Sequence, residues 1–235
     1  MTKKFIQGDC LEVLPKLGAF NLIITDPPYN IGWEYSKQIN DNRKDYHEWC
    51  LEWAMQCLRR NLQTNGRMAI INYPENNNIL YTKLIEKGYY FHEQLIWEYP
   101  TNIGHSNTKY TRNYRTIIIF SNYGQRGTFN PIKQPYKNPT DKRIAKKIAE
   151  GSEGTNHYAT FEYNLCKNVS KDKKNNGINQ LPKELVEMLI KTYSKEGDSV
   201  LDPFVGNGTV MDIAHELNRN AVGIDINSYN TSNKN

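Results

Sequence analysis

Short apolar runs alternate along this chain with stretches in which apolar residues recur at helical spacing. The runs hold β-branched and aliphatic residues and are bounded by polar or turn-forming residues, which is typical of β-strands. Strands are predicted over Lys4–Gln7, Leu22–Thr25, Met68–Asn72, Gln94–Glu98, Thr116–Ser121, Ser199–Asp202 and Ala221–Ile226. Helices are predicted over Tyr46–Asn61, Asn77–Glu86, Thr140–Glu150, Lys183–Tyr193 and Thr209–Leu217. This alternation predicts an α/β fold with a doubly wound, mostly parallel sheet.

Two local patterns refine this prediction. The run Thr116–Phe120 reads TIIIF, and apolar residues on successive positions indicate a strand that is buried on both faces. The pairs Asn65-Gly66 and Lys87-Gly88 follow the predicted helices Tyr46–Asn61 and Asn77–Glu86. Because glycine readily adopts the backbone conformation that ends helices, both pairs are expected to be C-terminal stops.

Between Pro100 and Ile178 the pattern loosens, and Asn, Lys, Tyr, Pro and Gly dominate. Four residues could still be buried there, which favours an irregular insertion over a free linker: Tyr158, Phe161, Tyr163 and Leu165. The chain is therefore divided into residues 1–100, 101–178 and 179–235, and the middle part includes the core strand near 116–121.

Composition narrows the class of protein. The 235 residues are 38% hydrophobic and 23% charged, enough for one large domain or a domain with an insertion. No apolar run approaches the ~20 residues that span a bilayer, and the N-terminus has no signal-peptide pattern, so a soluble cytoplasmic protein without a membrane partner is expected. The four cysteines lack CxxC spacing and the five histidines lack metal-binding spacing, which predicts reduced thiols and no metal.

The net charge of +5 is compatible with a polyanionic partner. Lysine and arginine concentrate in Lys133–Lys147 and Lys167–Lys174, where Tyr, Asn and Gly surround them. A solvated surface produces such runs as well, so charge alone leaves nucleic-acid binding and a bland surface equally open.

The segment Thr25–Ile31, TDPPYNI, follows a buried strand directly. Its two prolines lack N–H groups and restrict the backbone, so this loop is stiff and extended. The loop presents the Asp26 carboxylate, the Pro27 carbonyl and the Tyr29 ring together. That set suits a flat ring with an amino group better than a phosphate or a metal ion.

A second motif, SVLDPFVGNGTVMDIAHELNRNAVGIDIN, covers Ser199–Asn227. It predicts a strand, a loop with Gly206 and Gly208, a helix, and a strand that ends at Asp225, where a carboxylate can accept hydrogen bonds from ribose hydroxyls. Met211 breaks the G-x-G-x-x-G phosphate pattern, and Asp202 would repel phosphate but attract a cation. A nucleoside cofactor without phosphates is therefore favoured over a pyrophosphate cofactor, whereas the G-x-G pattern alone leaves a glycine turn that binds nothing equally open.

Together, DPPY (Asp26–Tyr29) and DPFVGNGT (Asp202–Thr209) resemble the motifs of amino-methylating DNA methyltransferases of restriction-modification type. The motif order resembles the permuted β group, and the likeness implies a Rossmann-like fold that uses S-adenosyl-methionine. The implied catalytic residues are Asp26, Pro27, Pro28 and Tyr29, with Tyr29 stacking on a base flipped out of the duplex. The implied cofactor-binding residues are Asp9, Cys10, Asp26, Gln180, Asp202, Phe204, Gly206, Gly208, Thr209 and Asp225.

Two of these assignments are qualified by the sequence itself. Asp9 could instead be the N-cap of a helix. Gln180 and Pro182 match a family segment HPxQxP, but Gly177 and Ile178 stand where that segment has His-Pro.

The resemblance also implies the substrate. Asp26 favours adenine N6 as the methylated atom, with cytosine N4 as the alternative and a non-catalytic nucleic-acid-binding relative as a third, weaker hypothesis. Ring-carbon methylation is disfavoured because no cysteine follows a proline. Residues 101–178 would then be the target-recognition region of a protein that binds double-stranded DNA.

The residues expected on the DNA side are Lys109, Arg112, Arg115, Lys171 and Lys173, each of which could equally be a solvated surface residue. A separate cognate restriction endonuclease is a further partner that the resemblance suggests. The sequence leaves open whether the chain is a monomer or a dimer.

Overall fold

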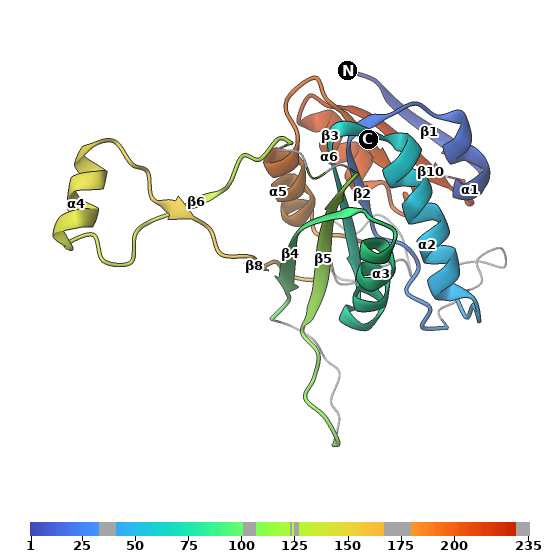
Figure 1. The fold of residues 1–235 in the computed structure, drawn as a ribbon, viewed down its shortest axis with the longest axis horizontal. Helices are drawn as coiled ribbons and strands as arrows, with labels where there is room; N and C mark the ends of the chain where they lie inside the picture. The colour runs from blue at the N-terminus through green and yellow to red at the C-terminus, as the bar shows by residue number, and fades with distance from the viewer. Residues whose placement is uncertain (33–40, 101–106, 123, 125–126, 167–179, 229–235) are drawn as a thin grey trace.

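The computed structural model describes residues 1–32, 41–100, 107–122, 124, 127–166 and 180–228, and Figure 1 shows their arrangement. The strands are β1 (Lys3–Gln7), β2 (Phe20–Thr25), β3 (Leu62–Asn72), β4 (Tyr90–Glu98), β5 (Tyr114–Ser121), β6 (Lys133–Gln134), β7 (Thr155–Asn156), β8 (Thr160–Glu162), β9 (Ser199–Asp202) and β10 (Asn220–Asp225). The α-helices are α1 (Cys10–Val13), α2 (Tyr46–Gln56), α3 (Pro74–Glu86), α4 (Lys142–Ala149), α5 (Lys183–Tyr193) and α6 (Thr209–Glu216).

Eight strands form one sheet in the order β1-β10-β9-β2-β3-β5-β4-β8. The five strands from β1 to β3 in this order are mutually parallel, and β5 lies antiparallel between β3 and β4. This arrangement confirms the predicted doubly wound, mostly parallel sheet. Thr116–Phe120 of β5 is buried throughout, as its apolar sequence predicts.

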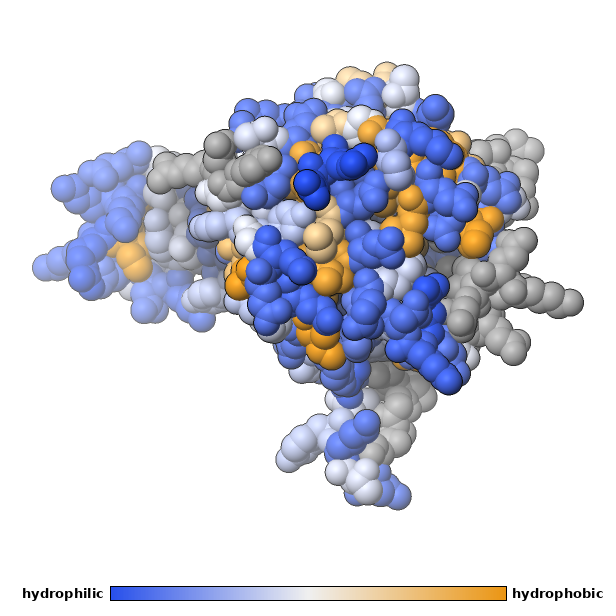
Figure 2. Space-filling view, turned by 45° about the vertical axis from the view of Figure 1, so that its right-hand side comes forward, coloured by the Kyte–Doolittle hydropathy of each residue, from blue (hydrophilic) through white to orange (hydrophobic). Residues whose placement is uncertain are grey.

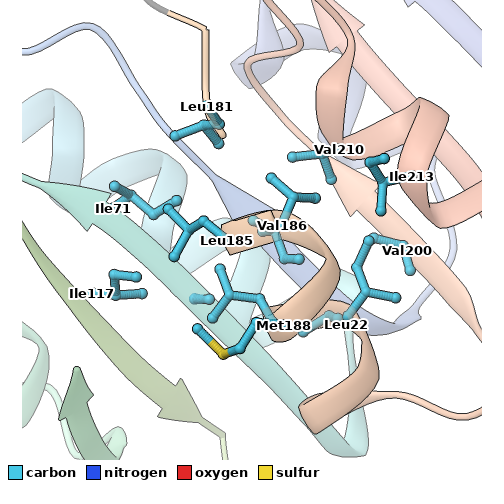
Figure 3. Packing of buried hydrophobic residues seen from close by; sticks show 14 of the residues in the cluster. Leu22, Ile71, Ile117, Leu181, Leu185, Val186, Met188, Val200, Val210 and Ile213 are labelled. Atoms are coloured by element: carbon cyan, nitrogen blue, oxygen red, sulfur yellow. The ribbon is translucent and has the colours of Figure 1, made fainter. Parts of the chain in front are cut away.

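Helices cover both faces of the sheet, because successive residues of a strand point to opposite faces. Leu22 and Ile24 of β2 pack with α5 and α6, whereas Ile23 packs with α1, α2 and α3. Figure 3 shows the first of these two cores, where Leu22, Ile71 and Ile117 of the sheet meet Leu185 and Val186 of α5.

The direction of winding reverses between β9 and β2. From β9 the chain passes through α6 to β10 on one side, and from β2 it passes through α2 to β3 on the other. In open α/β sheets, ligands bind outside the carboxyl ends of the strands at such a switch point. Both sequence motifs follow these two strands.

An arm between Phe129 and Tyr158 extends away from the body and carries the short β6–β7 pair and α4 (Figure 1). None of the residues of α4 is buried, and the arm is largely hydrophilic in Figure 2. Phe161, Tyr163 and Leu165 beyond the arm are partly buried against the core, as expected, whereas Tyr158 is 56% exposed. Among the described residues no helix is long and apolar enough to span a membrane.

One predicted helix stop is wrong and one is confirmed. Asn65 and Gly66 lie inside β3, because the preceding helix already ends in a π-helical turn at Cys57–Asn61. Lys87 caps α3 as expected, and Gly88 follows it with a φ of +83°.

Candidate active site

The DPPY loop begins where β2 ends at Thr25, and two helices hold its backbone. The Tyr46 hydroxyl of α2 donates a hydrogen bond of 2.7 Å to the Pro28 carbonyl. The Asn76 amide of α3 donates one of 3.0 Å to the Tyr29 carbonyl. Among the described residues, no donor is hydrogen-bonded to the Pro27 carbonyl. Two of the loop's carbonyls are thus anchored, and the one between Asp26 and Pro28 is left for a ligand.

Asp26 lies partly buried beside two groups that favour its ionised form. Burial raises the pKa of its carboxyl group to about 6, and the positive charge of Arg115 and a hydrogen bond from the Tyr29 hydroxyl offset part of that effect. The carboxylate is therefore poised to change its charge near neutral pH.

The Tyr29 ring is only 3% exposed. The Arg115 guanidinium lies 4.6 Å from its centroid, and the Tyr73 ring lies 5.0 Å away at a tilt of 56°. These contacts fix the orientation of the ring, so a stacked base would have to approach a side chain that is already held from two directions.

The glycine loop connects β9 to α6. Gly206 and Gly208 have φ values of +50° and +78°, which other residues rarely adopt, and Gly208 is the N-cap of α6. The Gly206 N–H donates a hydrogen bond of 2.8 Å to the Asp225 carboxylate, which also accepts one from Asn227. The loop and the end of β10 are thereby joined into one cradle.

Four neighbouring parallel strands each bring an aspartate to this edge of the sheet. Asp225 and Asp202 end β10 and β9, and Asp9 and Asp26 come shortly after β1 and β2. Burial, together with the charges of Asp225 and Asp26, raises the pKa of the Asp202 carboxyl well above its usual range. Such a row of carboxylates repels phosphate and attracts a cation.

The remaining predicted cofactor residues lie around this cradle. Asp9 accepts a hydrogen bond of 2.8 Å from the Leu11 N–H and so is the N-cap of α1, while Cys10 beside it is buried. Phe204 packs edge-on against Trp49 and Trp53 of α2. Gln180 is buried just before α5.

The five residues predicted on the DNA side have different surroundings. Lys109 is exposed, and Arg112 pairs with Glu75 and lies over the Tyr73 ring. Arg115 differs from the prediction, since it is only 3% exposed and lies beneath the DPPY tyrosine. Lys171 and Lys173 lie outside the described residues.

Three positioning residues were not found from the sequence: Tyr46, Asn72 and Asn76. The Asn72 side chain donates to the Tyr46 hydroxyl at 2.9 Å and accepts from Asn76 at 3.0 Å, so it links the two anchors of the loop. No local pattern marks these residues, because each acts through a contact that only the folded sheet creates. Among the described residues, no cluster of His, Cys, Asp and Glu could hold a metal ion.

The fold and this site define a class of protein, the amino-methylating DNA methyltransferases. The family model described as DNA methylase matches residues 20–233, and the chain belongs to that family. It is 32% identical to the type II methyltransferase M.HpaI of Haemophilus parainfluenzae, over 97% of this chain and 71% of that protein. It is 28% identical to the DNA adenine methyltransferase YhdJ of Escherichia coli, over 96% of this chain and 79% of that protein.

Solved structures share the fold. The cytosine-N4-specific PvuII DNA methyltransferase superposes with a TM-score of 0.72 at 17% identity, covering 97% of this chain and 83% of that one. The complex of M1.HpyAVI with S-adenosyl-methionine has a TM-score of 0.62 at 20% identity, covering 96% and 94%. The predicted family, fold and enzyme class are thus confirmed, and the cofactor of the second structure agrees with the one that the sequence predicts.

Proposed function

We propose that this enzyme transfers a methyl group from S-adenosyl-methionine to the exocyclic amino group of a flipped base in double-stranded DNA, with adenine N6 as the leading target. The observation that carries the proposal is that the Asp26 carboxylate and the Pro27 carbonyl, to which no described donor is hydrogen-bonded, follow each other at the switch point of the sheet. Two acceptors on one stiff loop, beside a cradle for a cationic nucleoside, match the two hydrogens of an amino group.

The proposed role of the DPPY loop follows from the chemistry of that amino group. Its nitrogen is a poor nucleophile because its lone pair is delocalised into the ring. Hydrogen bonds from the two N–H groups to Asp26 and Pro27 favour a more tetrahedral nitrogen and free the lone pair. With a pKa of about 6, Asp26 is also a better proton acceptor near neutral pH than an ordinary aspartate.

The cradle between β9 and β10 fits S-adenosyl-methionine, which supplies an electrophilic methyl group when it is bound. Asp225 would accept from the ribose hydroxyls, and Asp202 would face the positively charged amino-acid end. The Thr209 hydroxyl at the start of α6 is buried without a hydrogen-bond partner among the described residues, so it is available to a ligand. Asp9, Cys10 and Gln180 would complete the adenine side, and Phe204 the wall toward α2.

The choice of base rests on Asp26 and on one relative. The motif that begins with Asp is frequent among adenine-N6 enzymes, and the similar YhdJ is named an adenine methyltransferase. Cytosine N4 remains the second candidate, because the PvuII enzyme with the same fold is cytosine-N4-specific.

We assign DNA contact to residues 101–178, and above all to the arm. Four basic residues occupy two turns of α4 and are exposed: Lys142, Arg143, Lys146 and Lys147. Two exposed ion pairs, to Asp141 and Glu150, neutralise them only weakly. A basic helix with no buried face, held away from the body, suits the phosphates of a duplex beside the active site. Lys109, Arg112, Lys171 and Lys173 would extend that surface.

Restriction-modification is the proposed biological setting, because M.HpaI and M1.MboII are both named type II methyltransferases. A separate endonuclease that cuts the same site would then share the cytoplasm with this enzyme. Resistance of methylated plasmid DNA to one member of a panel of restriction enzymes would support this setting, and sensitivity to every member would contradict it.

The deciding experiment is incubation of duplex DNA with methyl-labelled S-adenosyl-methionine, followed by digestion and mass analysis of the nucleosides. Label on adenine N6 supports the leading proposal, and label on cytosine N4 supports the second. The adenine-N6 and the cytosine-N4 proposals would both be overturned if neither base carried label while the wild type and the Asp26→Ala variant bound the cofactor with equal affinity. The same incubation with duplex RNA tests whether the substrate is DNA alone.

A further inference from the structure

Arg115 of β5 lies in a box of aromatic rings at the active site. Its guanidinium carbon is 4.6 Å from the centroid of Tyr29, 5.1 Å from Trp97, 5.4 Å from Tyr73 and 5.9 Å from Tyr99. Trp97 and Tyr99 are themselves 0% and 3% exposed. The charge is therefore enclosed by four rings, which come from β4, the residue that follows β4, the DPPY loop and the residue before α3.

A buried cation of this kind needs compensation. Among the described residues no carboxylate forms an ion pair with Arg115, and its Nε is buried without a hydrogen-bond partner. Removing a guanidinium from water is costly, and the faces of aromatic rings return only part of that cost. Tyr29 connects Arg115 to a negative charge, because its ring lies over the guanidinium and its hydroxyl donates a hydrogen bond to the Asp26 carboxylate. The negative charge of Asp26 also interacts electrostatically with Arg115.

The surroundings of Asp26 have opposite effects on the pKa of its carboxyl group. The Tyr29 hydroxyl and the Arg115 charge favour the carboxylate, whereas burial favours the neutral acid. Asp202 of β9 brings a like charge to the same edge, since the two carboxylates interact. Arg115 is the cation whose charge lowers the pKa of the Asp26 carboxyl group, and the phenol groups of Tyr73 and Tyr99 face Arg115 in turn.

We propose that Arg115 is a positioning residue of the methyl-transfer site, which holds the Tyr29 ring by stacking and supplies the positive charge that keeps the Asp26 carboxylate ionised. The inference rests on the proposed function, because it gives Asp26 an acceptor role that only the ionised form fills completely. In this role Arg115 acts through Tyr29 and Asp26.

A purely structural role would look different. A buried arginine that only fills space would lower stability when it is replaced, without changing the titration of Asp26. Arg67 of β3 is a matched case, since it is 2% exposed and lies near Gly66 and Gly127. Its neighbour Met68 pairs with Phe120, so Arg67 lies at the opposite end of the β3–β5 pair from Arg115. Arg67→Met is therefore the control for burial without contact to the site.

The test follows the titration of Asp26 directly, by ¹³C NMR of carboxyl-labelled aspartate, with Asp26→Asn identifying the resonance. The variants are Arg115→Met and Arg115→Gln, which lose the charge, and Arg115→Lys, which keeps it. We expect both neutral variants to raise the midpoint by about one unit or more, a tenfold loss of the ionised fraction below it. Arg115→Lys and Arg67→Met should leave the midpoint near that of the wild type.

Turnover supplies the second readout. In Arg115→Met and Arg115→Gln, the acid limb of the pH–rate profile should move to higher pH. In Arg115→Lys the limb should stay at the same pH, but kcat should fall, because a lysine side chain cannot stack on the Tyr29 ring as a planar guanidinium does. An unchanged midpoint in the neutral variants would overturn the proposal. If neither neutral variant folds, Arg115→Lys becomes the deciding variant. A midpoint of the Asp26 titration that shifts upward in Arg115→Lys would contradict the proposal. An unchanged midpoint together with a lowered kcat would support it.

The NMR titration needs no turnover, so a failure of the proposed function is distinguishable from a failure of this inference. A protein that methylates no DNA but shows the shift on Arg115→Met would overturn the function alone. A protein that methylates DNA but shows no shift would overturn the role of Arg115 alone.

Discussion

The Tyr46 hydroxyl donates to the Pro28 carbonyl at 2.7 Å while it accepts from the Asn72 amide at 2.9 Å. One phenol thereby connects α2, the end of β3 and the DPPY loop. Among the described residues this hydroxyl is the donor that is hydrogen-bonded to the Pro28 carbonyl, so we expect it to help orient the neighbouring groups of Asp26 and Pro27.

Replacing that hydroxyl should reduce both stability and turnover. In Tyr46→Phe the Pro28 carbonyl and one Asn72 N–H lose their partner, which costs about 1–3 kcal/mol of unfolding free energy. We expect kcat to fall about tenfold with little change in the affinity for the cofactor, since the loop loses its alignment. Urea denaturation and single-turnover methylation measure the two effects.

Tyr193→Phe is the matched control. Tyr193 is also 3% exposed, and its hydroxyl bonds Glu93 at 3.0 Å, away from the site. It should cost stability and leave kcat unchanged. Equal losses of kcat in the two variants would show that turnover follows stability rather than the loop.

The raised pKa of Asp26, about 6, predicts opposite effects on activity and stability. Activity should fall as the pH drops through about 6, because protonation removes an acceptor. Asp26→Asn should lower kcat about 10²-fold or more. It should also raise the unfolding free energy at pH 7.5 by up to ~3 kcal/mol, since it removes a buried charge.

The sign of that stability gain can be checked by its pH dependence. An unfolded aspartate ionises near its ordinary value of 3.8, and the folded one near 6. The penalty for the buried charge is therefore absent below about 4, grows between these values and is complete above about 6. Urea denaturation at pH 4 should give equal unfolding free energies for the wild type and Asp26→Asn. A gain in the unfolding free energy of Asp26→Asn that is larger at pH 4 than at pH 7.5 would contradict the prediction.

The raised pKa of Asp202 predicts that cofactor binding releases protons. A cation near the carboxylate lowers its pKa, so S-adenosyl-methionine should bind more tightly as the pH rises. Calorimetry in two buffers of different ionisation enthalpy measures the proton release. Asp202→Asn should weaken binding about 10- to 100-fold and abolish the release, and a release that persists in this variant would assign the proton to another group.

Close packing under the glycine loop predicts that Gly223→Ala is disruptive. A Cβ atom there would lie 2.2 Å from the Met211 sulfur and 2.3 Å from a Val205 methyl group. We expect a loss of about 1–3 kcal/mol and weaker cofactor binding, because the loop must move. Gly18→Ala is the control, since nothing lies within 4 Å of its Cβ, and similar losses in both variants would contradict the packing argument.

The basic residues of α4 should contribute to DNA affinity. Changing Lys142, Arg143, Lys146 and Lys147 to Gln should weaken binding for all sequences and flatten its salt dependence by up to ~0.9 per lost phosphate contact. The control changes four exposed basic residues of the body by the same total charge: Lys4, Lys16, Arg59 and Arg60. If the DNA affinity falls equally in the α4 variant and in this control, the effect comes from the net charge and not from α4. Fluorescence anisotropy across a salt series measures both.

Local sequence patterns predicted those elements whose formation depends on neighbouring residues in the chain, but not those that depend on contacts between distant residues. The buried strands could be identified because a sheet covered on both faces requires successive apolar residues, as in β5. The end of the π-helical turn at Asn61 could not, because the Asn61 side chain is held there by hydrogen bonds to the carbonyls of Leu14 and Gly18, more than 40 positions away. Nothing between Asn61 and Gly66 records that contact.

The same limit applies to the site. Asp26 and Asp202 could be placed because each directly follows an apolar run, and the ends of parallel strands meet at one edge. Arg115 was expected on the DNA side because arginine side chains can contact phosphates and base edges. Its burial depends on rings contributed by Tyr29, Tyr73 and Trp97, which only the folding of the sheet brings together.

The pairing of β1 with β10 joins positions at opposite ends of the sequence: Lys3 pairs with Ala221, and Thr2 with Asn220, 218 positions apart. Strand pairs of such high sequence separation form late, because a long loop must close first. During translation, β1 emerges early and has no neighbour until β9, α6 and β10 have been synthesised. A ribosome-bound nascent chain therefore carries the DPPY loop before the glycine loop and β10 exist, so the two motifs meet at one edge of the sheet only after nearly the whole chain has been synthesised.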